Sequence, residues 1–290
     1  MKVWKMLCVI GLIAVMLFGC ASPKKEDAGT EPTEKNQSQE ETPPANQEEP
    51  ELQPNSQPLK DTMGEGFLTT TSLETQVPCK VRVFKEERPE EFCYMICIEV
   101  DTGVEVLKKE LTFCVPYEED YLYCVDIDSD GVQEIILHHN TGGCGGFGQY
   151  ISWIMKVTEE DILIIWDSAD LFDTGFNTGF KGVVADGYQL KVTHPVNDYV
   201  LLFEAKENHK IYFDETGKAD CDHEFMIDSF YEFEPLDKDK DGVFEIYCKQ
   251  YASLRGHADY VGSACSVWEW NNETNKLEII DAWFEPNTED

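Results

Sequence analysis

The chain has 290 residues, and its 57 aspartates and glutamates against 23 lysines and arginines give a net charge of −34 at pH 7. A surface this acidic repels phosphate backbones, which argues against nucleic-acid binding, and it attracts divalent cations. The length leaves room for one large domain or two small ones after the N-terminal segments.

Residues 1–19 are expected to be a secretory signal peptide. Residues 1–5 carry two lysines and no acid, and residues 6–18 are apolar without a charge. This layout is typical of a signal peptide, and the apolar run is shorter than the roughly 20 residues of a spanning helix. Gly19 followed by Cys20 resembles the lipobox of bacterial lipoproteins, which implies a lipid anchor on Cys20 at the extracytoplasmic face of the cell membrane. The alternative is a simple secretory signal with a cysteine there by chance.

Residues 20–60 are expected to form a disordered tether. They consist mainly of Glu, Pro, Gln, Asn, Ser and Thr, which cannot bury enough apolar surface to offset the entropy of the chain. The leader carries +2 and the tether −5, which leaves −31 for residues 61–290. We therefore expect a strongly acidic domain over residues 61–290, held away from the membrane.

The remaining sequence favours an all-β domain of antiparallel strands. Short apolar runs rich in β-branched and aromatic residues alternate with clusters of Gly, Asp, Asn and Pro. No helical period is sustained over three turns. The predicted strands cover residues 77–84, 92–100, 104–113, 121–125, 135–139, 150–157, 162–166, 188–193, 199–205, 243–249, 264–270 and 277–283.

Nine of the 11 cysteines lie in this domain. Export to an oxidising compartment favours disulfides, and an odd number leaves at least one thiol free or paired between chains. Cys93 and Cys97 lie in one predicted strand, about 13 Å apart, which is too far for a mutual bridge. Cys97, Cys114 and Cys124 sit inside apolar runs, where a buried thiol acts as a small hydrophobic residue. The disulfide-bonded state and the free, buried state therefore both remain open for these cysteines.

One segment of the domain is repeated. The sequence Asp-Ile-Asp-Ser-Asp-Gly-Val-Gln-Glu-Ile at residues 126–135 recurs as Asp-Lys-Asp-Lys-Asp-Gly-Val-Phe-Glu-Ile at residues 237–246. In both places an aromatic-rich strand precedes the segment, and a strand, a glycine-containing loop and a Trp-bearing strand follow it. This predicts two similar units, at about residues 115–160 and 225–285.

The repeated segment has the chemistry of a calcium loop. Aspartates at positions 1, 3 and 5 place three carboxylates around one turn, and Gly at position 6 allows a backbone where a Cβ would clash. A carbonyl at position 7 and an acid at position 9 complete an oxygen shell that suits Ca²⁺ better than Mg²⁺. The candidate ligands are Asp126, Asp128, Asp130, Val132 and Glu134, and then Asp237, Asp239, Asp241, Val243 and Glu245.

Two interpretations other than a pair of calcium sites are considered for this segment. An EF-hand needs flanking helices and an acid at position 12, where this chain has Leu137 or Cys248, so it is excluded. The other is an acidic turn that holds no metal. Since three or four carboxylates repel one another, a loop without a cation is expected to be unstable or partly open.

The arrangement strand, Asp-x-Asp-x-Asp-Gly, strand resembles the FG-GAP and VCBS repeats of calcium-binding β-propellers. The tether, the two loops and the segment Gly-His-Ala-Asp-Tyr-Val-Gly at residues 256–262 are similar to VCBS-type lipoproteins of Firmicutes. The resemblance implies two propeller-blade-like units in which calcium braces the blades. Full propellers repeat the loop about every 60 residues, whereas these copies lie 111 apart. We therefore expect a degenerate unit between them, or an irregular propeller or sandwich.

The expected function is a surface-anchored, non-catalytic binding module for a cell-envelope protein or a glycan. Tyr121, Tyr150 and Tyr260 beside the loops are candidates for a contact face, or else core residues. The chain has no Gly-x-Ser-x-Gly, His-Glu-x-x-His or Ser-x-x-Lys motif, and the glycine-rich residues 142–148 lack the Lys-Ser/Thr of a phosphate loop. The alternatives are an extracellular hydrolase that uses acidic residues, and a calcium sensor or inhibitor of a neighbouring membrane protein.

Overall fold

A computed structural model of the chain describes residues 68–71, 78–90, 93–114, 120–143, 149–174, 176, 178–220 and 223–288. All the described residues belong to one compact unit, residues 49–290. The predicted signal peptide, Cys20 and the whole predicted tether lie outside the described residues. Among the described residues, no helix is long and apolar enough to cross a membrane.

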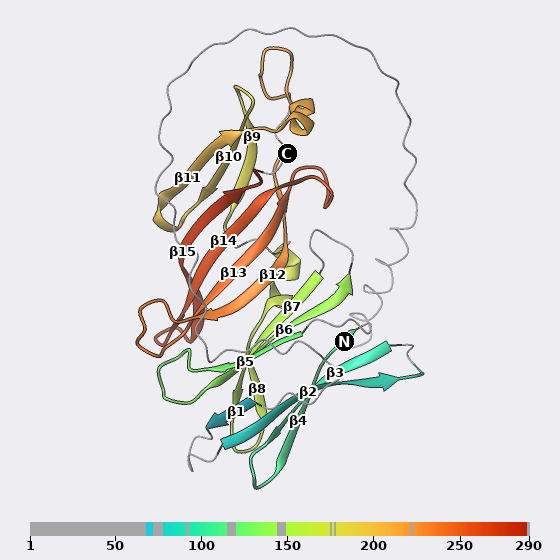
Figure 1. Ribbon diagram of the computed structural model, residues 1–290, viewed down its shortest axis with the longest axis vertical. Helices are drawn as coiled ribbons and strands as arrows, with labels where there is room; N and C mark the ends of the chain where they lie inside the picture. The colour runs from blue at the N-terminus through green and yellow to red at the C-terminus, as the bar shows by residue number, and fades with distance from the viewer. Residues whose placement is uncertain are drawn as a thin grey trace. The chain divides into compact units, whose positions relative to one another are not determined.

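The described part of the chain is all-β, as predicted, and its strands form antiparallel sheets in which sequence neighbours pair (Figure 1). The first sheet contains β1 (Leu68–Thr71), β2 (Pro78–Arg88), β3 (Cys93–Asp101) and β4 (Val106–Cys114). The second contains β5 (Asp120–Val125), β6 (Glu134–Gly143), β7 (Gln149–Val157) and β8 (Ile162–Asp167). The third contains β9 (Lys181–Ala185), β10 (Gln189–His194) and β11 (Tyr199–Glu204), and the fourth contains β12 (Met226–Leu236), β13 (Glu245–Ser253), β14 (Tyr260–Asn271) and β15 (Lys276–Pro286).

Short 3-10 helices connect some of these strands. They are η1 (Ser168–Thr174), η2 (Val196–Asp198) and η3 (Glu207–Tyr212). In the described residues these are the helical elements, which agrees with the missing helical period in the sequence.

Strands β6 and β7, in the middle of the β5–β8 sheet, are buried on both faces. Leu122, Leu137 and Trp153 join the core formed with the β1–β4 sheet. Tyr123 and Ile136, which point to the opposite face, join the core formed with the β12–β15 sheet. Burial on both faces explains why β6 and β7 appear in the sequence as nearly continuous apolar runs rather than as an alternating pattern.

One face of the β12–β15 sheet contributes to two hydrophobic cores. Ile246 and Cys248 pack in the core shared with β5–β8, and Ala252 belongs to the core shared with the β9–β11 sheet. All three residues have the same parity along β13, so they project from the same side of the strand. The opposite face carries a smaller cluster of Leu236, Tyr247, Val267 and Trp283.

Both predicted repeat units are four-stranded meanders, β5–β8 and β12–β15. The three-stranded β9–β11 sheet lies between them in the sequence and carries no aspartate loop of this kind, which accounts for the wide spacing of the two copies. Every predicted strand overlaps an observed one, but β1 and β9 were not predicted, and β12 was expected only as an aromatic-rich strand of unstated bounds before loop 2. The sequence of β9, Lys-Gly-Val-Val-Ala, contains only a short apolar run.

Four described cysteines are free thiols: Cys97, Cys124, Cys248 and Cys265. Three of them are buried, and Cys124 is half-buried. For these four, the second of the two predicted states, a free thiol in apolar surroundings, is confirmed.

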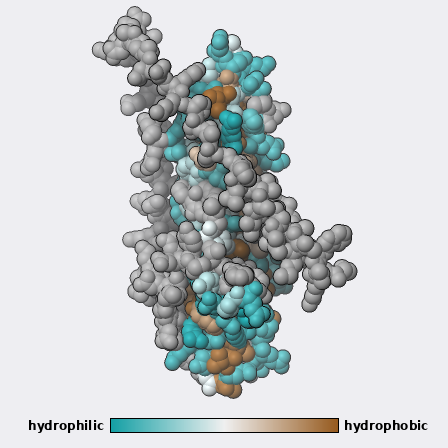
Figure 2. All heavy atoms as spheres, turned by 90° about the vertical axis from the view of Figure 1, so that its right-hand side faces the viewer, coloured by the Kyte–Doolittle hydropathy of each residue, from teal (hydrophilic) through white to brown (hydrophobic). Residues whose placement is uncertain are grey.

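The surface agrees with the acidic composition. Most of the coloured part of the face in Figure 2 is hydrophilic, and brown patches occupy small areas. In the described part of the chain, the most exposed large apolar side chain is Val104, in the turn before β4.

Candidate metal centres

The two aspartate loops adopt the same backbone conformation. Loop 1 (residues 126–134) joins β5 to β6, and loop 2 (residues 237–245) joins β12 to β13. Position 4 has a positive φ in both, 63° at Ser129 and 66° at Lys240, and so has position 6, 82° at Gly131 and 89° at Gly242. A repeated sequence thus gives a repeated turn.

The glycine at position 6 is explained by its backbone conformation. A Cβ built on Gly131 or Gly242 would meet no atom of a more distant residue within 4 Å. The clash that glycine avoids is local, because at a positive φ a Cβ comes too close to the adjacent backbone carbonyl oxygen.

The carboxylates hold these turns by accepting backbone hydrogen bonds. Asp126 accepts from the amides of Ser129 and Gly131 at 2.8 and 2.9 Å, one with each oxygen. Asp237 likewise accepts with both oxygens, from the amides of Asp241 and Gly242 at 3.1 and 3.3 Å, so its first partner lies one position later than in loop 1. The first aspartate is therefore a turn-forming residue in both loops, even before any cation is considered.

The later acids each bind the backbone with one oxygen. Asp130 Oδ1 accepts from Val132 N, and Asp241 Oδ1 accepts from Val243 N, both at 2.8 Å. Glu134 Oε2 accepts from the amide of Ile127 at 3.0 Å, and its counterpart Glu245 Oε2 accepts from Lys238 at 3.2 Å. These backbone hydrogen bonds use one oxygen of each acid and leave the second for another partner, which for Asp130 Oδ2 is Lys156.

Carboxylate oxygens converge in both loops. Ligand atoms of Asp126, Asp128 and Glu134 lie within 4.8 Å of one another, and so do those of Asp237, Asp239 and Asp241. The structure thus brings together three of the predicted acids in each loop, although not the same three. Val132 and Val243 follow the glycine as expected, and the side chain of Val132 is buried.

In loop 1 a lysine ammonium lies among these carboxylates. Lys156, on β7, places its Nζ 2.5 Å from Asp128 Oδ2, 2.6 Å from Asp130 Oδ2 and 3.6 Å from Glu134 Oε1. Partial burial opposes the charged form of this lysine, but its hydrogen bonds to the two aspartates prevail and raise its pKa. The same contacts lower the pKa of Asp130 despite partial burial.

Glu134 is the most buried acid of loop 1. Its side chain has no exposed surface, and Oε1 accepts no hydrogen bond. Burial raises its pKa to about 7, and the nearby charge of Asp128 adds to this effect, while the Ile127 amide and Lys156 oppose it. An oxygen in this position is suited to a cation, because a positive charge would compensate for the lost hydration.

Loop 2 has the same acids without the lysine. Among the residues that the structure describes, no Lys or Arg nitrogen lies within 4.0 Å of a carboxylate oxygen of Asp237, Asp239, Asp241 or Glu245; Lys238 points its ammonium toward Asp281, at 3.6 Å. Asp239 and Asp241 are exposed, and Glu245 is only half-buried. The two loops therefore share a backbone but differ in charge balance.

The loops also touch each other. The amide of Phe244 in loop 2 donates a hydrogen bond to the carbonyl of Asp126 in loop 1, at 2.8 Å. In addition, Asn272 of the β14–β15 turn donates its side-chain amide to the carbonyl of Asp128, at 2.9 Å. Segments far apart in the sequence thus form one group of loops, which the sequence gave no signal to predict because pairing between sheets leaves no local pattern.

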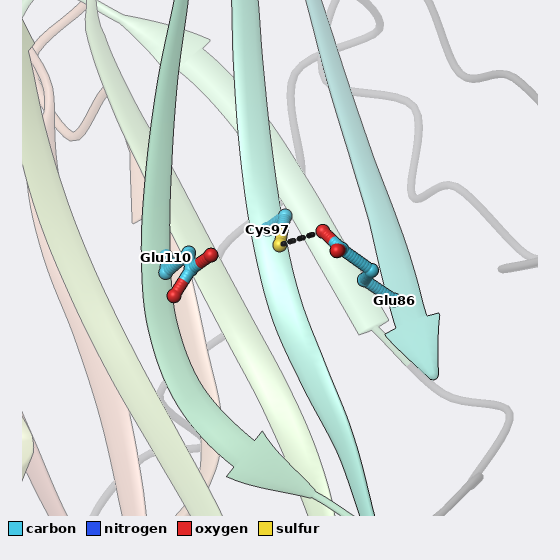
Figure 3. Close-up of side chains that lie close together, drawn as sticks. All are labelled: Glu86, Cys97 and Glu110. Carbon is cyan, nitrogen blue, oxygen red and sulfur yellow. Dashed lines mark hydrogen bonds between the residues drawn. The ribbon is translucent and has the colours of Figure 1, made fainter. Parts of the chain in front are cut away.

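A second cluster of possible ligands lies on the β1–β4 sheet. Figure 3 shows Cys97 of β3 between Glu86 of β2 and Glu110 of β4, with its thiol directed to Glu86. Lys108 and Arg88 already pair with these acids, at 2.7 Å from Glu86 and 2.5 Å from Glu110. Burial raises the pKa of Cys97 to about 11, so the thiol stays protonated at neutral pH, which weakens it as a ligand. The cluster is an ion-pair network.

The three tyrosines considered as a contact face are largely packed. Tyr150 is buried and stacks on His138, with ring centroids 4.5 Å apart. Tyr121 lies at the edge of the core between the two meanders, and Tyr260 stacks on Tyr251. Their roles in the described structure are those of core and strand-pairing residues.

No curated protein and no solved structure matches the chain. One protein-family model matches residues 178–285, less than half of the chain; this segment holds loop 2 and the strands from β9 into β15, whereas loop 1 lies outside it. Over these residues, the chain is similar to the family of the YybI C-terminal domain.

Proposed function

We propose that this chain is an exported lipoprotein, anchored through Cys20, whose β domain is stabilised by calcium at the two aspartate loops and serves as a non-catalytic binding module at the cell surface. Its partner would be a protein or a glycan of the cell envelope. The observation that carries the calcium part is that both loops repeat the same turn and gather three acidic side chains each.

Calcium would brace the turn of each loop within its own meander. The carboxylates of each loop come from a segment that joins two strands, and loop 1 and loop 2 are connected through the Phe244–Asp126 hydrogen bond. A cation that binds the folded loop but not the unfolded chain stabilises the fold, by about 2.7 kcal/mol per site when calcium is a hundredfold above Kd. Stabilised strands would then present a rigid surface to a partner.

Calorimetric titration of the purified chain with calcium tests this role. Asp128→Ala is expected to remove binding at loop 1 and Asp239→Ala binding at loop 2, while Asp220→Ala, an exposed aspartate outside both loops, leaves binding unchanged. Chelation is expected to lower the melting temperature by about 2–4 °C for each kcal/mol lost. Absence of calcium binding at millimolar concentration would refute the proposal.

The anchor is tested separately. Cys20→Ala is expected to abolish metabolic labelling with fatty acid, because no other cysteine adjoins the expected cleavage site. Labelling that persists in this variant would contradict the lipid attachment, without bearing on the calcium loops.

A further inference from the structure

The two meanders carry different residues at one equivalent position of the strand that follows the loop-bearing hairpin. In the first meander Ile135 of β6 pairs with Met155 of β7, and Lys156 follows. In the second meander the equivalent pair is Ile246 and Trp268, and the residue that follows is Glu269. The place that holds a cation in the first unit thus holds an acid in the second.

Lys156 meets the requirements of a bound cation in loop 1. Its Nζ contacts oxygens of Asp128 and Asp130 at hydrogen-bonding distance and approaches the buried Oε1 of Glu134, which accepts no hydrogen bond. Only 23% of the lysine side chain is exposed, so solvent screens these contacts less than it would on the open surface. The repulsion expected between the acids of loop 1 is therefore offset from within the chain.

We infer that Lys156 is an internal counter-cation that competes with calcium for loop 1, so that the two loops are unequal and loop 2 is the tighter calcium site. This inference rests on the proposed calcium function. Calcium reaches the Asp128, Asp130 and Glu134 oxygens of loop 1 only by displacing the ammonium, whereas at loop 2 no such displacement is needed. Loop 1 would then hold its shape at low calcium, and loop 2 would respond first as calcium rises.

The test compares calcium affinities at loop 1 alone. In the full chain, Asp239→Ala disables loop 2, and Lys156→Met is then added to it. Removal of the ammonium is expected to tighten calcium binding by at least about tenfold, since the competing contacts join a partly buried cation to several carboxylates. Lys109→Met, on the same Asp239→Ala background, is the matched control. Lys109 pairs with Asp161, its side chain is 30% exposed, and its loss changes the net charge equally. The control is expected to shift the affinity by less than about twofold.

A second readout covers the case in which Lys156→Met folds poorly. Without calcium, this variant is expected to melt at a lower temperature than the wild type, because the acids of loop 1 then repel one another. Calcium is expected to restore the melting temperature, and Lys156→Arg, which keeps the charge, to behave like the wild type. A loss of stability that millimolar calcium does not restore would overturn the inference.

The negative outcomes distinguish failure of the inference about Lys156 from failure of the proposed calcium function. If Asp239→Ala binds one calcium and Lys156→Met leaves its affinity unchanged, the lysine does not compete and the inference is wrong, while the calcium function stands. If the wild type binds one calcium but the double variant Lys156→Met/Asp239→Ala binds none, loop 1 is no calcium site and the inference is likewise wrong. If neither the wild type nor Lys156→Met binds calcium, the proposed function fails, and the inference with it.

Discussion

Protonation of His138 is expected to destabilise the protein between about pH 6.5 and pH 3. The imidazole lies on β6, is 2% exposed and stacks on Tyr150 in the interior of the described domain. Its Nδ1 is 2.8 Å from Ser152 Oγ and its Nε2 is 3.4 Å from the carbonyl of Tyr231 on β12. Burial lowers the pKa of His138 from 6.5 to about 3, and the neighbouring His139 adds to this, although the Tyr231 carbonyl opposes it.

The direction of the effect on stability follows from the lowered pKa of His138. The unfolded chain takes up a proton near pH 6.5, but the folded chain does so only near pH 3, so stability falls as the pH drops between these values. At pH 5 the loss in the free energy of unfolding amounts to about 2 kcal/mol, because each pH unit below 6.5 costs about 1.36 kcal/mol. For a domain of this size, this corresponds to roughly 4–8 °C in melting temperature.

Urea unfolding at pH 7 and pH 5, followed by tryptophan fluorescence, measures this effect. His138→Gln keeps a polar side chain that does not titrate, so the fall in stability between the two pH values is expected to be about 2 kcal/mol smaller than in the wild type. His223→Gln, which removes an exposed imidazole, is the control and is expected to behave like the wild type. A difference below about 0.5 kcal/mol between the wild type and His138→Gln would show that His138 does not carry the acid response.

Three further predictions concern packing. Gly182→Ala on β9 is expected to cost about 1–3 kcal/mol in chemical unfolding, because its Cβ would lie 2.0 Å from the ring of Phe225; an unchanged stability would contradict this. Phe233→Ala is expected to cost about 3–5 kcal/mol and to retain one unfolding transition in calorimetry, since the ring belongs to the core shared by β5–β8 and β12–β15; two separate transitions would argue against a common core. Cys248 and Cys265 are buried and burial raises their pKa, so a thiol reagent is expected to label them only after unfolding, and rapid labelling of the native protein would refute this.

Local sequence was sufficient to predict most of the strands and the two turns. Strand formation depends on β-branched and aromatic runs bounded by turn residues, and these features are readable without knowing the partner strand. The loops were equally accessible, because their aspartates bind amides only two to five residues away, as Asp126 binds Ser129 and Gly131. The all-β class and the convergence of acids in each loop followed from such short-range contacts.

Tertiary structure decided what surrounds each loop. Whether Lys156 reaches loop 1 depends on the register of β7 against β6, and whether Phe244 meets Asp126 depends on how two sheets pack; neither is encoded in a local pattern. The two loops have nearly the same sequence, yet one encloses an ammonium and the other does not. Electrostatic balance is set by side chains that come from other strands, so equal motifs acquire unequal chemistry once the chain is folded.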